Sequence, residues 1–226
     1  MQRKTISLLL AVLLSCFIFQ SAVAQEQRDE KISGEIRGGL RLLTLQPGQA
    51  NDLVIYRGDY IQPSIVGLER FVIAIPELDI TKTFPVKEGE KDYIKMKKPG
   101  NYSFSAGIAS GTIKVIDYAA ASYNELSTEQ AVKVLQNTNP LILDVRTQGE
   151  FQQGHIEGAN LLPVQALQQN MQSLAAYKDQ DIFIYCATGN RSTVASRILI
   201  EAGFKKIYNL RYGISDWAQR GNPVVR

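Results

Sequence analysis

The pattern of apolar and polar positions changes character near residue 118. Before that point, short apolar or alternating runs are separated by turn signals such as Pro47-Gly48 and Pro99-Gly100-Asn101, and no stretch has a 3.6-residue period. The pattern predicts strands at residues 40–45, 52–56, 71–75, 102–105 and 112–116. Several short strands at this spacing are typical of a β-sandwich or barrel.

After residue 122, strand and helix patterns alternate. The run Ser127-Thr128-Glu129-Gln130 is a capping box, which predicts a helix that continues to about residue 136. Further helices are predicted at 165–177, 192–202 and 214–220, and strands at 141–145, 181–185 and 207–210. Such alternation indicates a mostly parallel sheet covered on both faces. We therefore expect two domains, an all-β sandwich over residues 25–117 and an α/β domain over residues 123–226, joined by a linker at 118–122.

The first 24 residues are expected to lie outside both domains, as a signal peptide. Arg3 and Lys4 precede an apolar run at 6–19, and Ala22-Val23-Ala24 supplies the small-x-small pattern of a signal-peptidase site. This run is shorter than the roughly 20 residues of a membrane span. We expect cleavage after Ala24, secretion across the inner membrane to the periplasm, and no stable membrane span after processing. Retention as an anchor, or lipidation of Cys16, are the alternatives.

The net charge and the cysteine content limit which ligands and which reactions the sequence supports. The net charge of +3 is too small to argue for nucleic acid, and it is compatible with a small anionic substrate. Cys16 lies in the predicted signal peptide, so the processed chain would hold Cys186 alone and could form no internal disulfide. An unpaired thiol in an exported protein suggests reactivity, although a buried structural cysteine is the plain alternative.

The sequence around Cys186 favours reactivity. A predicted apolar strand ends directly before this residue, and Ala-Thr-Gly-Asn-Arg-Ser follows it into a predicted helix. Such a strand places the thiol at its C-terminal end, where open α/β sheets form their sites. Inward-turned N–H groups of the loop, the helix N-terminus and the Arg191 guanidinium would favour the thiolate and hold an anion beside it. A thiolate in an anion cradle suits attack on sulfur or phosphorus and needs no neighbouring base, which fits a chain whose only histidine is His155. A thiol sealed away from solvent would contradict this hypothesis.

Five blocks of sequence, in order along residues 122–226, resemble the rhodaneses. They are Leu143-Asp144-Val145-Arg146, the segment 150–160 that begins Glu-Phe-Gln-Gln-Gly-His-Ile, the loop 186–192, the segment 203–210 that begins Gly-Phe, and Gly213-Ile214-Ser215-Asp216-Trp217. The resemblance implies a rhodanese fold and a thiosulfate-type sulfurtransferase without a cofactor. Tyr212 departs from the family, where glycine is commoner before Gly213.

The resemblance also implies roles for individual residues. Cys186 would attack the outer sulfur of a small anionic donor such as thiosulfate, release sulfite, and pass its persulfide sulfur to cyanide or to a thiol acceptor, which a protein can also supply. Asp144 and Arg146 would support the loop, and His155 and Trp217 would be structural. The residues expected to bind substrate are Ala187, Thr188, Gly189, Asn190, Arg191 and Ser192.

Two other functions stay open for the same loop. Four residues separate Cys186 from Arg191, the number found in sulfur-transferring members of the family, whereas the related phosphatases and arsenate reductases have one more. A Cys-dependent phosphatase or arsenate reductase is therefore disfavoured. The second alternative is a non-catalytic persulfide carrier or partner-binding module.

The predicted β-sandwich resembles a cupredoxin. The resemblance rests on the segments 57–61, 71–73, 99–104 and 111–115. A blue-copper site needs two histidines and a cysteine, and residues 25–121 contain neither residue type, so we predict no metal there. Such a sandwich could act as a spacer, as a docking surface, or as a lid over Cys186, and the sequence does not select among these roles.

Overall fold

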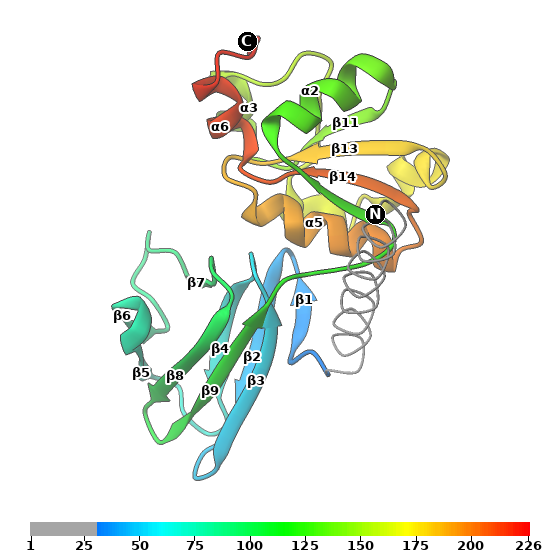
Figure 1. Ribbon diagram of the computed structural model, residues 1–226. Coiled ribbons are helices and arrows are strands. Elements are labelled where there is room, and N and C mark those ends of the chain that lie inside the picture. The colour runs from blue at the N-terminus through cyan, green and yellow to red at the C-terminus, as the bar shows by residue number, and fades with distance from the viewer. Residues whose placement is uncertain (1–30) are drawn as a thin grey trace, which may run out of the picture. The chain divides into compact units, whose positions relative to one another are not determined.

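A computed structural model describes residues 31–226 of the protein (Figure 1), and the signal-peptide prediction lies outside the described residues. Strands β1 to β9 form what we call the β region, residues 33–117. The strands are Glu35–Arg37 (β1), Leu40–Leu45 (β2), Ala50–Tyr56 (β3), Tyr60–Ile65 (β4), Phe71–Ile75 (β5), Ile80–Phe84 (β6), Ile94–Lys95 (β7), Gly100–Ala106 (β8) and Ala109–Ile116 (β9).

The β region consists of two mixed sheets. One has the strand order β1-β2-β4-β7 and the other β3-β9-β8-β5-β6. The β2–β4 and β3–β9 pairs are parallel, and the other pairs are antiparallel. Side chains alternate as expected for a half-buried strand, because Tyr102, Phe104 and Ala106 of β8 are buried while the residues between them are exposed. The all-β prediction is confirmed for this region.

Some strands of the β region were not predicted. β4 contains Pro63, which normally argues against a strand because proline has no N–H to donate. β6 has the sequence Ile-Thr-Lys-Thr-Phe, with only two apolar residues, and β7 has just two residues. Each of these strands is held by pairing with a neighbour, which local sequence does not reveal.

The α/β region, residues 123–226, contains one sheet of five parallel strands in the order β10-β14-β13-β11-β12. The predicted parallel sheet is therefore confirmed. The strands are Tyr123–Leu126 (β10), Leu141–Asp144 (β11), Asn160–Leu161 (β12), Asp181–Tyr185 (β13) and Lys206–Leu210 (β14). The helices are Thr128–Asn137 (α2), Gln148–Gln153 (α3), Val164–Leu167 (α4), Asn190–Glu201 (α5) and Gly213–Gln219 (α6), with a 3₁₀ helix at Met171–Tyr177 (η2).

Helices cover both faces of this sheet, with α5 on one face and α2 and α6 on the other (Figure 1). Two apolar clusters follow from this arrangement. Ile182, Ile184 and Cys186 pack with α5, whereas Phe183 and Tyr185 pack toward α2 and α6. This division follows from the two-residue period of β13, which sends successive side chains to opposite faces.

The helix predicted at 165–177 is the main error within this region. The structure has the short helix α4 and the separate 3₁₀ helix η2 in its place. Leu167 and Leu174 are both buried, so a single apolar face runs through the break. Periodicity alone therefore could not show where the helix is interrupted.

Both regions belong to the same compact unit, residues 33–226. Across residues 31–226 we find no helix with the length and apolar character needed to cross a membrane.

Candidate active site

Cys186 lies directly after β13, at the C-terminal end of the central strand of the parallel sheet. Its side chain points to the α5 face and is only 1 % exposed. The backbone N–H of Gly189 donates a hydrogen bond to Cys186 Sγ over 3.2 Å. This burial goes against the solvent-accessible thiol that the sequence hypothesis required, and Cys186 itself is not among the residues that line the neighbouring pocket.

Two glycines fit the loop closely against the turn that precedes α6. Gly189 has φ of 90°, and a Cβ there would lie 1.7 Å from the carbonyl oxygen of Arg211. Gly213 has φ of 66°, and its Cβ would lie 2.4 Å from the carbonyl oxygen of Cys186. That carbonyl also accepts a hydrogen bond from the Ile214 N–H over 2.8 Å. No residue with a side chain fits at these two positions, so the loop conformation depends on both glycines.

Helix α5 begins at Asn190, two residues earlier than predicted. The hydroxyl groups of Ser192 and Thr193 both donate to the carbonyl oxygen of Gly189, over 3.0 and 2.9 Å. Ser192 is fully buried and Asn190 is 9 % exposed. Of the predicted substrate-binding residues, these two therefore lie in the packed first turn of the helix.

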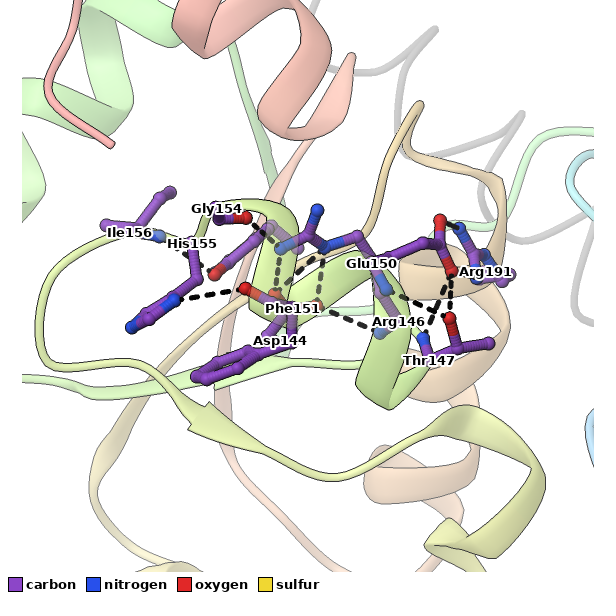
Figure 2. Close-up of polar contacts among 10 residues, drawn as sticks. Asp144, Arg146, Thr147, Glu150, Phe151, Gly154, His155, Ile156 and Arg191 are labelled. Atoms are coloured by element: carbon purple, nitrogen blue, oxygen red, sulfur yellow. Dashed lines mark hydrogen bonds and ion pairs between the residues drawn. The ribbon is translucent and has the colours of Figure 1, made fainter. Parts of the chain in front are cut away.

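Arg191 is paired with Glu150, a carboxylate that was not among the predicted site residues. Its guanidinium donates to both carboxylate oxygens, over 2.7 and 2.5 Å (Figure 2). Glu150 also accepts bonds from the N–H and hydroxyl of Thr147, which caps α3. The hydrogen bonds from Arg191 are the main reason that the pKa of Glu150 is lowered to about 2. The pair is therefore fully ionised at neutral pH, and the charge of Arg191 is largely offset.

Asp144 and Arg146 form a second, buried ion pair next to the C-terminal end of α3. Arg146 donates two bonds to one Asp144 oxygen, over 2.9 and 2.6 Å, and a third to the carbonyl oxygen of Gly154 over 2.7 Å (Figure 2). These contacts tie the end of β11 to the end of α3. His155 lies just beyond, with its ring stacked on Phe151 at a centroid distance of 3.8 Å. Within residues 31–226 we find no hydrogen bond from these residues to the Cys186 sulfur, and their support of the loop stays a prediction.

A pocket of about 400 Å³ lies at the active-site loop. The α/β region contributes Ala187, Thr188 and Arg191 from the loop, together with Thr147 and Glu150. The β region contributes the other wall, which includes Leu40, Tyr60, Lys91, Tyr93 and Lys95. Three of the predicted substrate-binding residues, Ala187, Thr188 and Arg191, therefore line a pocket. Among residues 31–226 we find no group of His, Cys, Asp or Glu side chains placed to hold a metal ion.

The site residues that were not predicted differ in how strongly their local sequence marked them. Glu150 stands three residues after Thr147, which is the spacing of a capping box, and Glu150 opens one of the blocks that resemble the rhodaneses. Tyr60 and Lys95 had no such signal. Their place beside the loop depends on how the β region packs against the α/β region.

Comparisons with known proteins identify the class of the α/β region. Residues 127–220 match the rhodanese-like domain family. A sulfurtransferase of Allochromatium vinosum is 38 % identical over 103 residues, which cover 45 % of this chain and 94 % of that protein. The thiosulfate sulfurtransferase GlpE of Coxiella burnetii is 30 % identical over 95 residues, which cover 42 % of this chain and 87 % of that protein. A rhodanese-related protein from Thermoplasma volcanium, known from its crystal structure, is 27 % identical with a TM-score of 0.41, covering 46 % of this chain and 98 % of that one.

The chain belongs to the rhodanese-like family through its α/β region. This membership supports sulfur transfer as its general activity. The matches to the two sulfurtransferases cover less than half of the chain.

Proposed function

We propose that the protein moves sulfane sulfur from a thiosulfate-like donor to a thiol or to cyanide through a persulfide on Cys186. The observation that carries the proposal is the position of this thiol. It follows the central strand of the sheet, accepts the N–H of Gly189, and belongs to a loop whose Ala187, Thr188 and Arg191 line a pocket. Two sulfurtransferases in the same family support the reaction type.

The proposed first step is an exchange at sulfur. The Cys186 thiolate attacks the outer sulfur of thiosulfate, and a new S–S bond forms as the old one breaks. The bonding pair leaves with sulfite, so the three negative charges of the reactants become a persulfide anion and a sulfite dianion. An acceptor thiolate then attacks the terminal sulfur and regenerates the Cys186 thiolate. The Gly189 N–H, which donates to Cys186 Sγ, is suited to stabilise the persulfide.

Other parts of the proposal rest on sequence. We propose that the protein is exported to the periplasm with cleavage after Ala24, because the N-terminal segment has the features of a signal peptide. We also propose that the β region is a cupredoxin-like sandwich without copper, since it pairs two mixed sheets and lacks the ligand residues.

Turnover tests the proposed function. The protein, thiosulfate and cyanide are mixed, and sulfite and thiocyanate are both measured. We expect equal amounts of the two products, and none from the Cys186→Ser variant, because the less acidic hydroxyl cannot act as the sulfur carrier. A generic phosphate ester is the second substrate. Hydrolysis of this ester without sulfite release from thiosulfate would overturn the proposal.

A further inference from the structure

The β region is fixed against the active-site helix by the turn between β3 and β4. Gly58 lies so close to α5 that a Cβ there would be 3.0 Å from the carbonyl oxygen of Asn190. The next residue, Asp59, is 1 % exposed and pairs with Arg41 of β2 over 2.5 Å and with Arg197 of α5. Arg197 itself is fully buried. This turn therefore places the start of β4 beside the first residues of α5.

Because this turn positions β4, Tyr60 and its neighbour Lys95 lie at the pocket. Tyr60 follows Asp59 directly, and its register partner across the antiparallel β4–β7 pair is Lys95. The Lys95 ammonium lies 5.4 Å from the centroid of the Tyr60 ring, and both residues line the pocket. Tyr93 packs edge-on against Tyr60 at 4.9 Å. The ammonium is thus directed along an aromatic surface on the wall opposite the loop.

Lys95 and Arg191 face the same pocket with different electrostatic partners. Arg191 is neutralised by both oxygens of Glu150, whereas no carboxylate in residues 31–226 pairs with Lys95. The pKa of Lys95 is lowered first by burial and then by nearby cations, including Arg191, while a negative charge on Cys186 raises it. Lys95 faces the loop around the sulfur, because the two line opposite sides of the same pocket. Burial also raises the pKa of Tyr60, so this residue stays neutral.

We infer that the β region forms the substrate-recognition wall of the active site, and that Lys95 provides the positive charge that binds the anionic end of a small sulfur donor. This inference rests on the proposed function and deepens it. Among the three roles left open by the sequence, a spacer, a docking surface or a lid over Cys186, it is nearest to the lid, as a fixed wall beside the loop. A pocket of about 400 Å³ between two walls fits a small anion and excludes a folded protein from the pocket itself.

Alkylation of Cys186 tests this inference without requiring sulfur transfer. Iodoacetate is anionic and iodoacetamide is neutral, and both react in the same way, with the thiolate sulfur forming an S–C bond as iodide leaves with the electrons of the C–I bond. The ratio of the iodoacetate rate constant to the iodoacetamide rate constant therefore reports the charge of the pocket. In Lys95→Gln we expect this ratio to fall by roughly three- to ten-fold, the size expected for removing one charge from a partly desolvated site. Lys95→Arg should restore the ratio.

Lys97→Gln is the matched control. It removes the same charge two residues further along, from an exposed side chain outside the pocket, and should leave the ratio within two-fold of wild type. An equal ratio in Lys95→Gln and Lys97→Gln would overturn the inference. So would a wild-type thiol that neither reagent reaches at neutral pH, because the pocket would then not lead to the sulfur.

Sulfite release separates the two proposals. If wild type releases sulfite from thiosulfate, Lys95→Gln should raise the KM for thiosulfate by at least three-fold and change kcat less. If Lys95→Gln has an unchanged KM for thiosulfate and normal turnover, the proposed role of Lys95 is wrong, and the proposed sulfur transfer still stands. Absence of sulfite release in wild type, with the alkylation ratio behaving as expected, sinks the sulfur donor and leaves Lys95 as an anion-binding residue.

Discussion

The two walls of the pocket differ in how their charges are balanced. On the α/β wall, Arg191 donates one hydrogen bond to each carboxylate oxygen of Glu150. Behind this pair, Arg146 donates two hydrogen bonds to one oxygen of Asp144. On the wall from the β region, Lys95 lies against the ring of Tyr60 and has no carboxylate partner within the described residues. One wall is charged but internally neutralised, and the other carries net positive charge.

This difference indicates a division of labour. Paired charges hold their side chains in one geometry, which suits the wall that must shape a tight loop around Cys186. An unpaired ammonium keeps its charge available to a ligand, which suits recognition of an anion. A single-domain protein with only the α/β wall would lack this second contribution.

The largest effect is expected from removing the link that holds the walls together. Asp59→Ala leaves Arg41 and Arg197 buried without their shared carboxylate, and loss of one partner of a buried pair costs about 3–5 kcal/mol. We expect the urea midpoint of unfolding to fall accordingly, as measured by circular dichroism. Asp52→Ala, which removes an exposed carboxylate bonded to Thr112, is the control and should change little. Equal midpoints in the two variants would show that the β region is not fixed by this turn.

Glu150→Gln should change the ratio of the iodoacetate to the iodoacetamide rate constant by a smaller factor than Lys95→Gln, and in the opposite direction. This variant removes the carboxylate that offsets Arg191, so the α/β wall becomes net positive. The ratio of iodoacetate to iodoacetamide rate constants at Cys186 should then rise by roughly two- to five-fold. Glu157→Gln, at an exposed position outside the pocket, is the control. If Glu150→Gln lowers the ratio or leaves it unchanged, the contrast between the walls is wrong.

The smallest effect is expected on the free energy of unfolding at acidic pH. Arg191 and the Thr147 cap lower the pKa of Glu150 to about 2 in the folded protein, below its ordinary value of 4.5. A lowered carboxyl pKa stabilises the fold above the unfolded value and loses this contribution as pH falls from about 4.5 toward 2. Wild type should therefore be more stable than Glu150→Gln at pH 6, by about 1 kcal/mol or less because the pair is partly exposed, and this margin should shrink by pH 3. A margin that grows on acidification would contradict the assignment.

Much of the α/β wall was predictable because its signals are local. The apolar strand before Cys186, the glycine at 189 and the arginine at 191 stand within one short segment, and the parallel sheet follows from alternating elements. Glu150 could have been added, since its spacing from Thr147 marks a helix cap. Its pairing with Arg191 could not have been derived from that spacing, because the two residues stand 41 positions apart.

The opposite wall was not predictable for a physical reason. Lys95 occupies a two-residue strand with no periodic signal, and its position depends on pairing with β4 and on a buried aspartate that joins two arginines far apart in sequence. In the sequence, the segment 57–61 contributed only to the resemblance to a cupredoxin. Its role as the contact with α5 is a property of tertiary packing, which period and composition do not encode.

The central claim is that Cys186, although nearly buried, carries sulfur at the junction of these two walls. Mass spectrometry of the intact protein after incubation with thiosulfate tests it most directly. We expect one added sulfur atom, located on the peptide that contains Cys186, removable by cyanide or dithiothreitol and absent from Cys186→Ser. A wild-type protein whose mass does not change, or a sulfur atom that also appears in Cys186→Ser, would show that Cys186 does not carry the sulfur.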